Sequence, residues 1–184
     1  MVQSLRRGGP RVARGSYTPR EMGLVTPTFS FGAQVAEVEV DRDTGGVRVT
    51  RIHTAHDCGT PLNPQMVEGQ VEGCVQMGLG YALTEELVMS QGRTLNATFL
   101  DYKIPGALDM PRMDSVCVGG PEPRGPFGAK ESGEGPTSPT APAIAEAVWH
   151  ATGYRARRLP ITAEQVLHHL EADRTLNDDR LTKP

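Results

Sequence analysis

The chain has 184 residues, of which 38% are hydrophobic, so it can bury one core or two lobes that share a core. Its net charge is −3, and its Lys and Arg residues are scattered except for a cluster near the N-terminus. The negative charge and the scattering argue against a nucleic-acid-binding protein. No apolar run approaches the roughly 18 residues of a membrane span, and the start of the chain lacks the apolar segment of a signal peptide. We therefore expect neither nucleic acid nor a membrane as a partner.

The three cysteines, Cys58, Cys74 and Cys117, lie far apart and form no CxxC pair. This spacing argues against a disulfide framework, a structural zinc site and an iron–sulfur cluster held by this chain. It fits a reducing compartment, so we expect a cytoplasmic protein.

Residues 1–27 are rich in Arg, Gly and Pro and show no periodicity, which predicts an extended basic arm. Apolar and polar residues then alternate over residues 31–40 and again over 47–52, with a turn sequence at 41–46 between them. Such a pattern predicts a β-hairpin, which we interpret as scaffold.

His53, His56 and Asp57 follow the hairpin and are residue types that bind metals. The two histidines do not have the spacing of one helical face, and no second group of ligands completes a site. We therefore expect a turn rich in side-chain-to-backbone hydrogen bonds and assign no metal ligand. Asn63 followed by Pro64 then predicts the start of a helix.

The predicted helix covers residues 64–88 and is apolar on a broad face. Each glycine in a helix interior costs about 1 kcal/mol relative to alanine, so several of them indicate that another helix or a flat cofactor passes close to the backbone. Gln70 and Gln76 lie among these glycines, where a primary amide could donate to and accept from a heterocycle. Four glycines lie inside this helix: Gly69, Gly73, Gly78 and Gly80.

The rest of the chain predicts short strands and two C-terminal helices. The final helix has Thr162 as its cap and an apolar face on one side, and the polar residues after it are expected to be frayed. The predicted elements are strands at 95–104 and 114–118, a helix at 143–151, an extended piece at 158–162, a helix at 163–172 and a polar tail at 173–184.

Residues 128–136 place one carboxylate, Glu134, between Gly133 and Gly135. Glycines leave little bulk beside the carboxylate, so a planar ligand could approach it edge-on. Residues 136–142 have the composition of a helix cap, which would point the positive end of the next helix toward the same place. This arrangement suits a general base beside an anionic cofactor, although an ordinary surface loop with a spare acid would look the same.

Taken in order, four motifs resemble the C-terminal portion of the large subunit of molybdenum hydroxylases. This superfamily contains xanthine dehydrogenase, aldehyde oxidoreductase and hydroxybenzoyl-CoA reductase. The resemblance covers residues 28–172 and implies an α+β fold in which a β-hairpin and short strands pack with a Gly-rich helix and two further C-terminal helices, as part of a larger molybdopterin-binding domain. Its motifs are residues 57–64, residues 67–73 with 76–80, residues 128–134 and residues 159–162.

The resemblance also implies roles for individual residues. Glu134 matches the glutamate that acts as general base at the molybdenum centre. Gln70 matches a glutamine that holds the pterin edge of the cofactor. The neighbouring glycines would make room for the cofactor: Gly69, Gly73, Gly133 and Gly135.

The resemblance further implies a set of partners. The cofactor would be molybdenum–molybdopterin, in its plain or its cytosine dinucleotide form, and electrons would pass to iron–sulfur clusters and FAD on partner domains or subunits. The reaction would be hydroxylation or reductive dehydroxylation of an aromatic or N-heterocyclic small molecule, such as a purine or an aromatic acyl-CoA. A complete large subunit is several times longer, so we expect the remainder of that subunit as a further partner and expect the chain alone to be inactive. The alternative is a structural piece that binds no cofactor.

Glu131 departs from the family pattern, because many relatives have glycine at this position. It adds a second carboxylate three residues before Glu134. If the two carboxylates faced each other, the pKa of one of them should rise.

Overall fold

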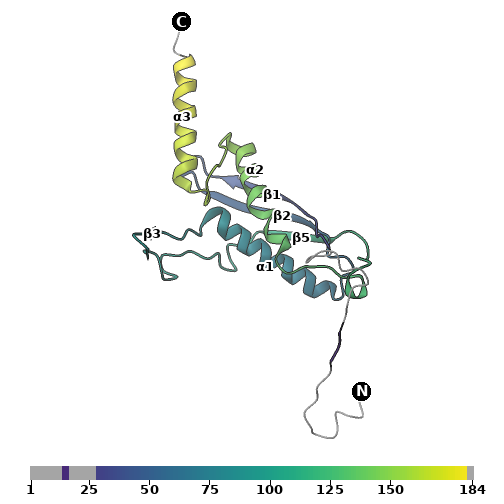
Figure 1. Ribbon diagram of the computed structural model, residues 1–184. Coiled ribbons are helices and arrows are strands. Elements are labelled where there is room, and N and C mark those ends of the chain that lie inside the picture. Colours follow the sequence, from purple (N-terminus) through teal and green to yellow (C-terminus); the bar gives the residue numbers. More distant parts are fainter. Residues whose placement is uncertain (1–13, 17–27, 182–184) are drawn as a thin grey trace.

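The computed structural model describes residues 14–16 and 28–181, so most of the predicted basic arm, residues 1–27, falls outside the described residues. The described part mixes strands and helices, as the sequence predicted (Figure 1). Its elements in chain order are β1 (Gly32–Val40), β2 (Val47–His56), α1 (Pro64–Leu83), β3 (Met89–Ser90), β4 (Arg93–Thr94), β5 (Arg112–Cys117), η2 (Pro126–Gly128), η3 (Gly135–Thr137), α2 (Thr140–Thr152) and α3 (Ala163–Leu181).

The predicted β-hairpin is confirmed by β1 and β2, which pair antiparallel with Val40 opposite Val47. The turn between them closes where the Asp41 N–H donates to the Gly46 carbonyl oxygen at 2.8 Å. β2 continues past the predicted end to His56, because β5 pairs with it in parallel from Arg51 onward. The short strand predicted at 114–118 is thereby confirmed.

The glycine-rich helix begins as predicted, since the Asn63 side chain accepts a hydrogen bond from the Met66 N–H at 3.2 Å. It ends at Leu83 and not at residue 88, so the predicted boundary was wrong. The Gly80 carbonyl oxygen accepts hydrogen bonds from the backbone N–H groups of both Thr84 and Glu85, at 2.9 and 2.8 Å. This pair of bonds turns the chain out of the helix.

Residues 84–111 leave the body of the molecule and return to it, and β3 and β4 form their outer end (Figure 1). The strand predicted at 95–104 was wrong: only Arg93–Thr94 pairs with another strand, and the chain then turns so that the Tyr102 N–H donates to the Thr98 carbonyl oxygen at 2.8 Å. The alternation that suggested a strand places apolar side chains in solvent, with Phe99 81% exposed.

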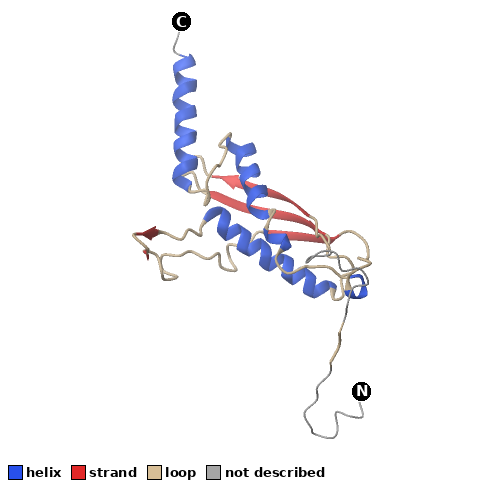
Figure 2. Ribbon diagram, viewed as in Figure 1, coloured by secondary structure: helices blue, strands red, loops and turns tan. Residues whose placement is uncertain are grey.

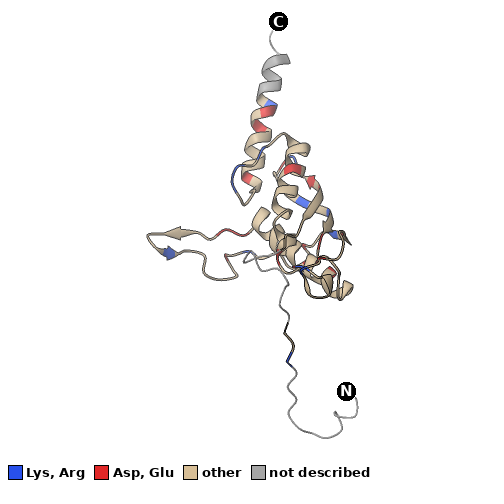
Figure 3. Ribbon diagram, turned by 45° about the vertical axis from the view of Figure 1, so that its right-hand side comes forward, with Lys and Arg blue, Asp and Glu red and all other residues tan. Residues whose placement is uncertain are grey.

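The core lies between the sheet and the helices. The sheet order is β1-β2-β5, and α1 and α2 lie along one of its faces (Figure 2). Val49 and Ile52 of β2 are buried there with Ile144 and Val148 of α2. The other face of the sheet is mainly polar, although Val35 and Val116 are exposed on it. Charged residues of both signs are interspersed along the described chain (Figure 3).

Two helices close the fold, as predicted, but with different bounds. α2 begins at Thr140, and no side chain caps it, so the predicted cap in residues 136–142 was wrong. Thr162 caps α3 reciprocally with Gln165, through two backbone-to-side-chain bonds of 3.3 Å. α3 continues to Leu181, so most of the tail predicted to fray is helical. In the described part of the chain, no helix has the length and hydrophobicity that a bilayer span requires.

Candidate functional site

The glycine-rich helix and the glutamate loop, residues 128–136, meet at one carbonyl group. The Gly133 oxygen lies 3.5 Å from Gln70 Nε2 and 2.9 Å from the Cys74 thiol, and both side chains come from α1. The structure therefore places the predicted cofactor-binding residues Gln70 and Gly133 next to each other, and Glu134 is the next residue along the loop. Cys74 was not predicted as part of this site; all three cysteines have free thiols.

Glu134 is exposed and stands at the start of the short turn η3, where its carbonyl oxygen accepts a hydrogen bond from the Thr137 N–H at 3.0 Å. Its carboxylate makes no hydrogen bond or ion pair with the described residues. The side chain is thus held only through its backbone and can reach a ligand. α2 begins at Thr140, six residues after Glu134 and with η3 between them, whereas the sequence predicted a helix from residue 143.

Glu131 organises the backbone of the loop. One oxygen of its carboxylate, Oε1, accepts hydrogen bonds from the N–H groups of Glu134, at 2.8 Å, and Gly135, at 3.0 Å. Burial raises the pKa of Glu131, but the hydrogen bonds from Gly135 and Glu134 and the nearby His56 outweigh burial and hold its pKa below the ordinary value. The carboxylate faces amide groups and not a second carboxylate, so the rise in pKa expected for one member of the pair does not occur at Glu131.

An ion pair fastens the loop to the end of β2. Lys130 Nζ contacts Asp57 Oδ2, and it also donates to the Phe29 carbonyl oxygen at 2.9 Å. The side chains of the pair are only 8% and 12% exposed. The hydrogen bond from Lys130 is the main reason why the pKa of Asp57 lies below its ordinary value. Neither residue was predicted to contact the other, because 73 positions separate them.

The two histidines lie within β2, so the predicted turn begins only after them, where the Gly59 N–H donates to Asp57 Oδ1 at 3.1 Å. His53 contacts Glu37 and Asp114 on the polar face of the sheet, each at 3.4 Å. His56 is buried; its Nε2 lies 3.3 Å from the Glu131 carbonyl oxygen and its Nδ1 has no partner. Among the described residues, no group of three or more His, Cys, Asp or Glu side chains could hold a metal ion.

The four glycines of α1 divide into two pairs. A Cβ atom on Gly78 would lie 2.4 Å from Thr140 of α2, and one on Gly80 would meet the Glu85 carboxylate, so the chain itself accounts for these two. A Cβ atom on Gly69 or Gly73 would meet nothing within 4 Å. The open pair flanks Gln70, on the side of the helix that leaves room for something outside the described chain.

The glycines of the loop differ in the same way. A Cβ atom on Gly135 would lie 2.7 Å from the Glu131 carboxylate and 3.2 Å from His56, so this position is filled from within the chain. A Cβ atom on Gly133 would meet only the Glu131 carboxylate, at 3.7 Å. Room beside Glu134 is therefore on the Gly133 side, whereas the sequence had suggested both sides.

Gln76, which the sequence also suggested for heterocycle binding, has another task. Its Nε2 donates to the Pro105 carbonyl oxygen at 2.8 Å and so ties the projecting segment to α1. The amide oxygen of neither glutamine accepts a hydrogen bond from the described residues, but the Nε2 of Gln70 makes only a long contact, of 3.5 Å, whereas that of Gln76 is firmly bonded at 2.8 Å.

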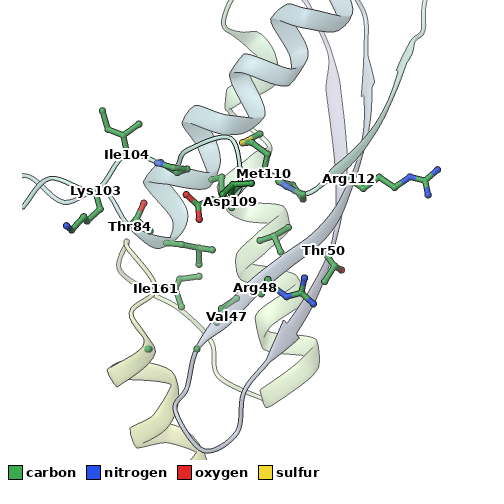
Figure 4. A pocket seen from close by; sticks show the side chains of 18 residues that line it. Val47, Arg48, Thr50, Thr84, Lys103, Ile104, Asp109, Met110, Arg112 and Ile161 are labelled. Carbon is green, nitrogen blue, oxygen red and sulfur yellow. The ribbon is translucent and has the colours of Figure 1, made fainter. Parts of the chain in front are cut away.

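A cavity of about 740 Å³ lies at the C-terminal end of α1 (Figure 4). Gln70 lies near the other end of this helix. The cavity is lined by the first residues of β2, by Leu79 and Leu83, and by the segment that returns to β5. Gln70 is 13 residues from Leu83, which is about 20 Å along a helix. We therefore place the site by its hydrogen bonds and not by cavity size.

Smaller hollows flank the glutamate loop. One of about 180 Å³ lies between Gln70 and Lys130, and one of about 580 Å³ lies beside Glu131 and Ser30. Since neither hollow is lined by Glu134, the described chain supplies one wall of a site and not a closed pocket around Glu134.

Comparison with known proteins agrees with this picture. The family model of the molybdopterin cofactor-binding domain matches residues 1–111. The chain belongs to this family. It is 38% identical over 157 residues to the putative xanthine dehydrogenase molybdenum-binding subunit of Escherichia coli (strain K12), which covers 83% of this chain and 21% of that protein. It is 35% identical to the carbon monoxide dehydrogenase large chain of Afipia carboxidovorans, over 66% of this chain and 15% of that one.

Solved structures of the molybdenum hydroxylase family have the same fold. Aldehyde oxidoreductase from Desulfovibrio gigas superposes with a TM-score of 0.71 at 35% identity, over 77% of this chain and 15% of that one. Reconstituted CO dehydrogenase from Oligotropha carboxidovorans gives 0.72 at 31% identity, over 79% of this chain and 18% of that one. The resemblance to molybdenum-binding large subunits is thus confirmed. This chain spans about one fifth of the length of these relatives.

Proposed function

We propose that this chain completes a molybdopterin site in a molybdenum hydroxylase, together with the remainder of the large subunit. The observation that carries the proposal is the contact between Gln70 and Gly133, which brings the amide expected to hold the pterin to the residue directly before the glutamate expected to act as base. The open sides of Gly69 and Gly73 fit a flat group lying on α1 next to Gln70.

Each residue has a defined task in this proposal. Gln70 hydrogen-bonds the pterin edge, and Gly69, Gly73 and Gly133 leave room for it. The bound cofactor would supply two-electron redox chemistry. Glu134 accepts a proton at its carboxylate as the substrate is hydroxylated, and a positioned base of this kind contributes about 10²–10⁴-fold to the rate.

The incomplete pocket supports a need for partners. Glu134 is exposed in the described chain, and a general base works best where water is excluded. We propose that the remainder of the large subunit covers this wall and that iron–sulfur and FAD subunits accept the electrons. The substrate would be an aromatic or N-heterocyclic small molecule. In this proposal the cofactor is molybdenum–molybdopterin in its plain or its cytosine dinucleotide form, and the complex is cytoplasmic.

Metal analysis of the complex isolated from its source tests the proposal, with the partner chains identified by mass. We expect molybdenum in the complex and none in the chain expressed alone. A complex that contains this chain but no molybdenum would support the alternative of a structural piece. Tightly bound molybdenum in the monomeric chain would contradict the need for the remainder of the large subunit.

A further inference from the structure

The Glu131 carboxylate lies at the centre of the glutamate loop. Its Oε1 accepts the N–H groups of Glu134 and Gly135, which are the peptide groups on either side of the Glu134 Cα. These two bonds, of 2.8 and 3.0 Å, fix the orientation of both peptide planes. The direction in which the Glu134 side chain leaves the backbone is therefore set by Glu131.

Glu131 is itself held from the other side. Its carbonyl oxygen lies 3.3 Å from Ser30 Oγ and 3.3 Å from Nε2 of the buried His56. Because the partner is a carbonyl oxygen, His56 Nε2 must carry the proton of this bond. The preceding residue, Lys130, is paired with Asp57 and donates its N–H to the Cys58 carbonyl oxygen at 2.8 Å. Residues 130 and 131 are thus attached to the end of β2 and to the residues that follow it.

The Glu134 side chain is not oriented by contacts of its own, because its carboxylate has no hydrogen bond or ion pair with the described residues. The pKa of Glu131 lies below its ordinary value, so its carboxylate is ionised at neutral pH and its bonds to the two amides are charge-assisted. A glutamate reaches both amides, whereas an aspartate is one methylene shorter.

We propose that Glu131 is a positioning residue that aims Glu134 by binding the two peptide N–H groups around it. The inference rests on the proposed role of Glu134 as the base. The role of Glu131 differs from general stabilisation of the loop. The orientation of Glu134 would depend on an acceptor oxygen at the distance that the Glu131 side chain provides, and not on negative charge in the loop.

Hydrogen exchange of residues 128–137 and steady-state kinetics, both on the assembled complex, test this inference. In Glu131→Ala we expect the amides of Glu134 and Gly135 to exchange at least tenfold faster, while the Lys130 amide stays protected. We also expect kcat to fall at least tenfold with KM and molybdenum content unchanged, because a misaimed base affects the chemical step. Glu131→Gln keeps an acceptor oxygen at the same reach and should restore both properties to within about threefold.

Glu131→Asp keeps the negative charge but shortens the side chain by one methylene, so it separates the effect of side-chain length from that of charge. It also provides the test if the alanine variant does not assemble. It should resemble Glu131→Ala in both exchange and kcat, although it keeps the charge. Glu164→Ala, which removes an exposed carboxylate from α3, is the control and should change neither property. Unchanged exchange in Glu131→Ala, or an aspartate variant that outperforms the glutamine variant, would overturn the inference. Because exchange does not depend on turnover, a wrong assignment of Glu134 as the base would leave the exchange result intact.

Discussion

Gln70 and Gly133 are 63 positions apart in the chain, yet Gln70 Nε2 lies 3.5 Å from the Gly133 carbonyl oxygen. The Cys74 thiol donates to the same oxygen at 2.9 Å, so α1 holds the loop at the residue before Glu134. A contact of 3.5 Å is at the weak limit of a hydrogen bond, and Gln70 can turn its amide to a ligand without loss to the fold.

Replacing Gln70 by alanine should therefore weaken cofactor retention and leave the fold intact. A buried heterocycle that loses its amide partner is destabilised by about 1–3 kcal/mol, which corresponds to roughly five- to 150-fold weaker binding. The measurement is the molybdenum content of the assembled complex at limiting cofactor supply. Gln76→Ala is the matched control, since Gln76 bonds Pro105, and it should retain full molybdenum. Full occupancy in Gln70→Ala would mean that Gln70 is no contact.

The glycines of α1 allow a second test, in which stability and cofactor retention change in opposite directions. In Gly73→Ala the added methyl group meets nothing in the described chain, so helix propensity should raise the free energy of unfolding by about 1 kcal/mol. The same methyl group would stand where the cofactor is proposed to lie, so molybdenum content should fall.

Gly78→Ala provides the contrast to Gly73→Ala. Its methyl group would lie 2.4 Å from Thr140, and overpacking of this kind costs about 1–3 kcal/mol. Urea unfolding of the full chain and metal analysis of the complex measure the two effects. If Gly73→Ala keeps all its molybdenum, the open face of α1 does not receive the cofactor.

The sequence predicted those parts of the fold that depend on local patterns. The hairpin, the Asn63 cap and the Thr162 cap follow from alternation and capping residues near each other in the chain, and all are confirmed. The strand predicted at 95–104 does not form, because apolar and polar alternation gives a strand only where a partner strand is available to pair with it.

The sequence indicated the candidate residues Glu134 and Gln70, but not the contacts that hold the glutamate loop in place. Glu134 and Gln70 were singled out by the glycines around them, and the resemblance to a family implied their roles. The anchors Asp57 and His56 were missed, because the bonds that tie them to residues 130–131 join segments about 75 positions apart, which no local pattern encodes.

The Lys130–Asp57 ion pair predicts a pH-dependent contribution to stability. The pKa of Asp57 is lowered in the folded state, so its contribution is present above its ordinary value of 3.8 and is lost as the pH falls through the folded-state pKa. Asp57→Asn should destabilise the chain by about 2–4 kcal/mol at pH 7, because it leaves Lys130 buried without its carboxylate. Urea unfolding between pH 7 and pH 2.5 measures the difference.

The difference in the free energy of unfolding between wild type and Asp57→Asn should become smaller as the pH falls toward 2.5. Glu39→Gln provides the comparison, since Glu39 pairs with Arg48 in an exposed ion pair and should cost no more than about 1 kcal/mol. A difference that stays constant down to pH 2.5 would show that the Asp57 carboxylate acts through packing and not through its charge.

Glu134→Gln in the assembled complex tests the central claim most directly. The amide keeps the shape of the side chain but cannot accept the proton, and Glu131 still holds the backbone through the N–H groups of residues 134 and 135. We expect molybdenum content equal to wild type and a loss of at least about a hundredfold in turnover at saturating substrate. Turnover within a few-fold of wild type, with the same molybdenum content, would contradict the assignment of Glu134 as the base.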